Sequence, residues 1–96
     1  MNIIETYKQQ IEAELELVKA KLKVLSAKAK IVSADTNLKY LKEINAMEDE
    51  YASVKSKLDK LGEASENTWE DLKEETEDAW NSLRANVKGA FAKLKE

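Results

Sequence analysis

Side chains that could carry out chemistry are few in this 96-residue chain. It has no His and no Cys, which excludes thiolate catalysis and Cys-ligated zinc. Five of its six serines lie in helical sequence without a general base beside them: Ser26, Ser33, Ser53, Ser56 and Ser82. No glycine-rich phosphate loop is present, because the glycines are Gly62 and Gly89. We therefore expect no catalytic residues, no cofactor and no enzymatic activity.

Carboxylates gather between Glu63 and Asp78, where eight acidic residues accompany one Lys. Such a cluster could bind a cation, but no loop has calcium-ligand spacing and no His accompanies the Glu residues. Pairs four apart, such as Glu70 and Glu74, repel each other mildly on a helix. We predict a solvated helix face without a metal site; a docking surface for a basic partner is the alternative.

A basic stretch without any acidic residue runs from Leu17 to Ala34. Nucleic acid or an anionic membrane could bind such a stretch. However, Lys19 and Lys21 point to different sides of a helix, and the whole chain has a net charge of −3. We predict a solvated face, which could attract the acidic segment of another subunit; we expect no nucleic-acid partner and regard a membrane surface as less favoured.

Composition points to an all-α chain in a single domain, residues 1–96. There is no Pro, charged residues make up 36% of the chain, and the β-branched residues recur at helical spacing. No apolar run approaches the roughly 20 residues that span a bilayer. The N-terminal sequence lacks a basic leader followed by a long apolar run, so we expect no signal peptide and a cytoplasmic protein.

An apolar stripe in steps of three and four marks the first two thirds of the chain. Its first members are Ile4, Tyr7, Ile11, Leu15, Val18, Leu22 and Leu25. The same steps continue without a break to Leu61, and a turn would give no reason for the two halves to stay in phase. The pattern therefore predicts one helix over about residues 2–61, about 90 Å long at 1.5 Å per residue.

The alternative is a break at residues 33–37, Ser-Ala-Asp-Thr-Asn, whose polar side chains favour caps and turns. Ser33, Asp35 or Asn37 could cap a second helix, which would give a monomeric three-helix bundle. Keeping these residues helical costs only about half a kcal/mol each, and no Gly or Pro forces a turn. We therefore favour the unbroken helix.

A stronger signal for a turn follows at about residues 62–66. Gly62 suits the left-handed position after a helix, and Ser65, Asn67 or Thr68 could cap the next one. The last helix, about residues 67–95, repeats aromatic residues and Leu every eleven positions, so that they return to one face. We predict that this face packs in an antiparallel helical hairpin through Trp69, Leu72, Trp80, Leu83, Val87, Phe91 and Leu94.

This coiled-coil hairpin would leave part of its own apolar surface uncovered. A last helix of about 28 residues reaches back only to about residue 33, so the stripe from Ile4 to Leu25 lacks a cover. Because burying each large apolar side chain contributes about 1.5–3 kcal/mol, a partner is required. We predict a homo-oligomeric bundle in which Ile4, Tyr7, Ile11, Leu15, Val18, Leu22 and Leu25 form the interface; another helical protein is the alternative partner.

The segment from Leu61 to Glu96 resembles the C-terminal signature of a family of small bacterial coiled-coil proteins. Members carry a Ser, then W-E-D-L-K, then A-W-x-x-L, after a long helix rich in Lys, Glu and Ala. Trp69 to Leu72 and Ala79 to Leu83 are the distinctive matches, whereas the apolar stretch from Ile31 to Leu41 departs from the pattern. The family is loosely described as stress-responsive or uncharacterised, so the resemblance implies no functional residues.

Two functions are therefore considered. The favoured one is a non-enzymatic, self-associating coiled-coil scaffold or binding protein linked to stress. The alternative is a peripheral protein that coats lipid or granule surfaces, since helices with eleven-residue repeats do so in apolipoprotein-like proteins. The apolar arc around Trp69, Trp80 and Phe91 covers only about a third of the helix, which favours packing inside a bundle.

Overall fold

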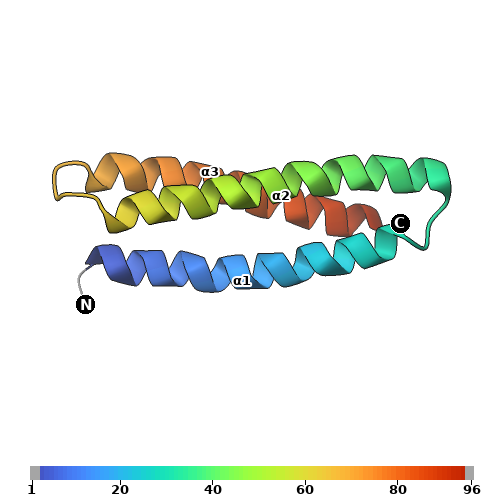
Figure 1. Cartoon of the computed structure of the whole chain (residues 1–96), viewed down its shortest axis with the longest axis horizontal. Coiled ribbons are helices and arrows are strands. Elements are labelled where there is room, and N and C mark those ends of the chain that lie inside the picture. Colours follow the sequence, from blue (N-terminus) through green and yellow to red (C-terminus); the bar gives the residue numbers. More distant parts are fainter. Residues whose placement is uncertain (1–2, 95–96) are drawn as a thin grey trace.

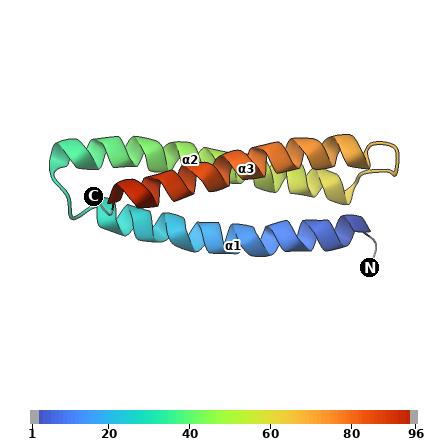
Figure 2. The same cartoon turned by 180° about the vertical axis from the view of Figure 1, so that it is seen from behind.

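Three long helices lie side by side and form a rod, in which the second helix runs antiparallel to the first and the third (Figure 1). The computed structural model describes residues 3–94, with side chains over residues 3–93. Helix α1 spans Ile3–Ala29, α2 spans Ala34–Gly62 and α3 spans Trp69–Leu94. The rod measures 51 × 19 × 17 Å, and the reverse view shows α3 crossing over α2 along its length (Figure 2).

The prediction of one unbroken helix over residues 2–61 is wrong. The chain leaves the helix after Ala29 and re-enters it at Ala34, so the break lies at residues 30–33, at the edge of the alternative site at 33–37. The three-helix arrangement is therefore the one this chain adopts. Residue 2 lies outside the described residues, and assembly into a homo-oligomer stays a prediction.

Polar contacts stabilise the turn between α1 and α2. The Asn37 side-chain amide donates a hydrogen bond of 2.5 Å to the carbonyl of Ala29, the last residue of α1. That carbonyl has no partner within its own helix, because the last four carbonyls of any helix lack one. The Asn37 backbone N–H donates to the Ser33 carbonyl at 2.7 Å, and the Ser33 hydroxyl donates to Thr36 Oγ1 at 2.9 Å. Asn37 thus connects the C-terminal end of α1 to the first turn of α2 through hydrogen bonds.

Burial of α1 decides between the two arrangements. In the bundle, six apolar residues of α1 become buried against the other helices: Ile11, Leu15, Val18, Leu22, Leu25 and Ala29. Their burial contributes on the order of 10 kcal/mol. An unbroken helix would leave these side chains exposed and would also carry the propensity cost of the polar turn residues, so a single chain folds back on itself.

The second turn differs in detail from the sequence prediction. Gly62 is still helical and has no positive φ, so the left-handed Gly predicted there is absent. The helix instead closes at Glu63, with φ −103° and ψ 0°, whose N–H donates to carbonyls of the preceding turn. The Ser65 carbonyl accepts the N–H groups of Thr68 and Trp69, and α3 begins at Trp69 instead of at residue 67. Residue 95, its predicted end, lies outside the described residues.

Candidate functional site

The residues predicted to form an oligomer interface lie inside the bundle of a single chain. Ile11, Leu15, Val18, Leu22 and Leu25 are buried in its core, and Ile4 and Tyr7 are half-buried. The inference that α3 leaves this stripe uncovered is therefore wrong, because α2 also folds back along it. These side chains are not a free surface of the described chain.

The residues predicted for hairpin packing lie on the inner side of α3. Trp80, Leu83 and Val87 are buried, while Trp69, Leu72 and Phe91 are half-buried and pack at the edge of the core. The Leu94 side chain lies outside the described residues. Thr76, between the apolar positions, is buried too, and its hydroxyl donates a 2.7 Å hydrogen bond to the Leu72 carbonyl. This backbone acceptor lets a polar side chain stay in the core.

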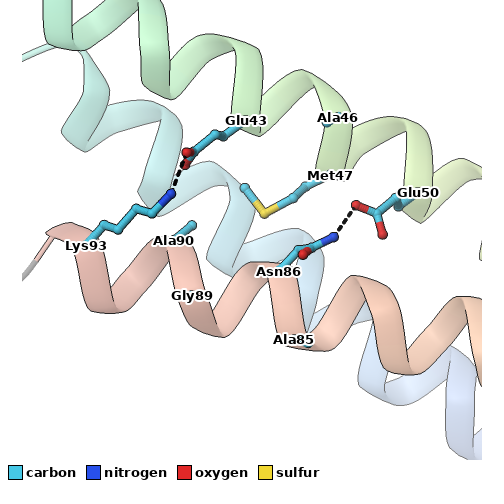
Figure 3. A pocket seen from close by; sticks show the side chains of 9 residues that line it. All are labelled: Glu43, Ala46, Met47, Glu50, Ala85, Asn86, Gly89, Ala90 and Lys93. Carbon is cyan, nitrogen blue, oxygen red and sulfur yellow. Dashed lines mark hydrogen bonds and ion pairs between the residues drawn. The ribbon is translucent and has the colours of Figure 1, made fainter.

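A shallow hollow of about 320 Å³ lies between α2 and α3 (Figure 3). Small residues of both helices leave the space open, and Met47 and Ala90 are buried at its base. Its rim carries Lys93, whose ammonium binds the Glu43 carboxylate at 2.7 Å. The Asn86 amide donates to the Glu50 carboxylate at 2.7 Å.

The polar groups of this hollow are already paired with one another. The hydrogen bond and the charge of Glu43 raise the pKa of the Lys93 ammonium, which therefore stays charged. Glu50 also accepts a hydrogen bond of 3.1 Å from the Ser82 hydroxyl. Because each rim pair crosses from α2 to α3, we interpret the hollow as a place where the two helices are held in register.

An aromatic cluster joins the start of α1 to the start of α3. The Tyr7 and Trp69 rings meet edge to face with centroids 5.6 Å apart. The Lys73 ammonium lies 5.5 Å from the Tyr7 ring and 5.7 Å from the Trp69 ring, within cation–π range. Burial raises the pKa of the Tyr7 hydroxyl to about 12, with a further contribution from the nearby Glu77 carboxylate. The hydroxyl oxygen is buried and makes no hydrogen bond of good geometry among the described residues.

The fold separates charge between the two halves of the rod. The basic half comprises residues 17–47 and 81–94, and it contains ten Lys and Arg residues but two acidic ones. The acidic half comprises residues 3–16 and 48–80, with sixteen acidic residues and five Lys. Antiparallel packing causes this separation, because it brings the basic halves of all three helices to the end that holds the α1–α2 turn (Figure 1).

A second stripe runs along the outside of α1, on the opposite side from its core residues. We call it the outer stripe: its helical members are Ile3, Thr6, Gln10, Ala13, Leu17, Ala20, Val24 and Ala27, and Ile31 follows them in the turn after α1. All nine are exposed, and the large apolar ones strongly so, with Leu17 66% and Ile31 84% exposed. Their steps alternate between three and four, the spacing of a coiled-coil seam. This stripe was not predicted from the sequence, although its spacing is a readable signal.

Comparisons with known proteins add no assignment. No protein-family model matches the chain, and no curated protein or solved structure matches it. The resemblance carried by Trp69 to Leu72 and Ala79 to Leu83 therefore stays a prediction. Over the described residues, no three His, Cys, Asp or Glu side chains are placed to share a metal ion. None of the helices in residues 3–94 has the length and apolar character needed to traverse a bilayer.

Proposed function

We propose that this chain is a non-enzymatic scaffold that self-associates, and that the outer stripe of α1 is the contact between copies. The observation that supports this proposal is the exposed apolar spacing of the stripe. On the helix its large apolar members are Ile3, Leu17 and Val24, with Gln10 between the first two. When two copies of α1 pair antiparallel with Leu17 at the centre, Leu17 meets Leu17 of the second copy and Val24 meets Gln10. Ile3 comes opposite the turn that carries Ile31. Such a pairing is self-complementary, as a two-fold interface requires.

The charges beside the outer stripe suit the same arrangement. In α1 the acidic residues come early and the basic ones late, so antiparallel pairing sets opposite charges side by side. Glu14 and Glu16 of each copy come near Lys21 and Lys23 of the other. Parallel pairing would place like charges together at both ends, which is unfavourable. Ala13 and Ala20 are small and exposed on this side, so they allow the two helices to approach closely.

The energetics predict a reversible association. Two copies contribute eight large apolar side chains from the outer stripe, whose burial gives on the order of 10 kcal/mol. Association costs about 4–15 kcal/mol in lost translational and rotational freedom. At most about 6 kcal/mol remains, so we expect a weak association with a dissociation constant of tens of micromolar or higher; the constant rises with salt, and the dimer fraction rises with protein concentration.

Sedimentation across a dilution series tests this function. The wild-type mass should rise from one chain toward two from tens of micromolar upward, and Leu17→Lys with Val24→Lys should stay at one chain. A matched control with Ala52→Lys and Ser56→Lys adds the same charge on exposed sites of α2 and should associate like the wild type. A wild-type chain that stays single at every concentration would refute the proposal.

A second candidate function is binding to an anionic lipid or granule surface, favoured by the basic half of the rod. Exposed Ile31 lies in the turn at that end, and exposed Leu38 and Leu41 lie in the first turns of α2, where they could enter a lipid interface. Flotation with anionic vesicles, compared with neutral vesicles, tests it. Absence of the chain from both floated fractions would remove this candidate. A cytoplasmic location and a link to stress stay proposals that rest on sequence alone.

A further inference from the structure

An open groove between α1 and α3 differs from the hollow between α2 and α3. It has a volume of about 560 Å³. Val18 of α1 and Val87 of α3 are buried at its base, and the half-buried Phe91 ring continues this apolar surface. The rim is formed by Lys21, Arg84 and Lys88, all exposed.

The cations of this groove lack acidic neighbours on the helices that form it. From Leu17 to Ala29 and from Asn81 to Leu94, these helices contain no Asp or Glu. The Arg84 guanidinium donates to the Asn81 side-chain oxygen at 3.2 Å, which leaves other N–H donors of its fork for a ligand. Lys28 adds a further positive charge, with its ammonium 6.0 Å from the centre of the Phe91 ring. An apolar base with an unneutralised basic rim suits a ligand that is apolar and anionic at once.

We propose that the groove binds a single-chain amphiphile with an anionic head, of the class of the long-chain fatty carboxylates. The alkyl chain lies on Val18, Val87 and Phe91, and the carboxylate lies between Arg84 and Lys88. A guanidinium binds a planar carboxylate through two parallel hydrogen bonds, so Arg84 is the main contact of the head.

The dimensions favour an alkyl chain over a partner helix. The α3 residues that line the groove, Arg84 to Ala92, span about 12 Å along the helix axis. A docked helix is itself about 10 Å wide and needs several turns of contact to bury an apolar face. An extended alkyl chain needs only the strip between two helices. This ligand site lies on α3 and the α3 side of α1, so it goes beyond self-association through the outer stripe.

Calorimetric titration with octanoate, decanoate and dodecanoate below their micellar concentrations tests the proposal. Affinity should rise by about fourfold for each added methylene until the groove is full, because each buried methylene contributes a constant increment. An alkyl trimethylammonium of equal chain length should bind at least tenfold more weakly. A flat response to chain length, or equal binding of the cationic amphiphile, would overturn the proposal.

Charge variants locate the site. Arg84→Glu with Lys88→Glu should weaken dodecanoate binding at least tenfold. Lys39→Glu with Lys42→Glu makes the same change in net charge on exposed sites of α2 away from the groove and should leave binding unchanged. An equal loss of dodecanoate affinity in both double variants would show general charge attraction and would refute the groove as the binding site. Helical content by circular dichroism and mass by sedimentation, measured on each variant, separate loss of this site from unfolding and from loss of self-association.

Discussion

Replacing Asn37 with Ala removes the hydrogen bond that joins the start of α2 to the end of α1. The Asn37 amide and the Ala29 carbonyl are 2.5 Å apart and partly buried, and Ala29 itself is fully buried. Without the amide, this carbonyl loses its side-chain partner, and a buried unsatisfied group costs about 1–3 kcal/mol. Ala is a better helix former than Asn by about 0.6 kcal/mol, which offsets part of the loss. We therefore expect a net loss of about 1–2 kcal/mol.

Urea and thermal unfolding measure this loss, with Asn45→Ala as the control. Asn45 lies within α2 and is exposed, so its replacement isolates the gain in helix propensity. Asn45→Ala should stabilise the chain by about 0.5 kcal/mol. Asn37→Ala should lower the melting temperature by about 4–15 °C, since 1 kcal/mol corresponds to about 4–8 °C in a domain of this size. If both variants change stability equally, the Asn37 bond does not hold the turn, and the reasoning fails.

Three further predictions concern single positions in the core and on the surface. Gly89→Ala should stabilise the chain by about 0.5–1 kcal/mol in urea unfolding, because Gly89 is in a helix interior and an added Cβ meets nothing within 4 Å. Destabilisation would show that the hollow between α2 and α3 has no room for the added methyl group. Leu58→Ala should cost about 2–5 kcal/mol by the same measurement, since Leu58 is 1% exposed, and a loss below 1 kcal/mol would contradict its place in the core. The raised Tyr7 pKa stabilises the fold below the unfolded value near pH 10, and this contribution is lost as pH rises to about 12. The loss is on the order of 1 kcal/mol after discounting for partial solvent exposure, and Tyr7→Phe should reduce it in unfolding followed from pH 9 to 12; an unchanged pH profile would exclude Tyr7 as its source.

The sequence predicted an all-α chain because helical spacing is a local property that survives in any arrangement. It also predicted a turn near Gly62, where small and capping residues follow each other. The break after Ala29 was missed because apolar residues keep recurring every three or four positions across it. Each helix of a bundle needs an inner stripe, and two stripes separated by a short turn can match in phase by coincidence. Continuity of the pattern was therefore no evidence for continuity of the helix.

The contacts that decide the fold were not readable as local patterns. Asn37 acts on a carbonyl eight residues earlier, so its role appears only once the chain has turned. The basic and acidic stretches of the single helices were visible, but their segregation into two halves depends on the reversed direction of α2 between α1 and α3. The groove between α1 and α3 requires Val18 and Val87 to be neighbours, which a hairpin without the first turn does not bring about. The outer stripe, by contrast, could have been found by testing both sides of α1 for the same spacing.

Opposite charge at the two ends gives this rod a large permanent dipole moment along its length. We expect a negatively charged surface to orient the rod end-on, with the α1–α2 turn directed toward it. Added salt shortens the reach of this orienting field to about 8–10 Å at physiological ionic strength, well below the 51 Å length of the rod. The rod is then aligned only when one of its ends already lies within about 8–10 Å of the charged surface.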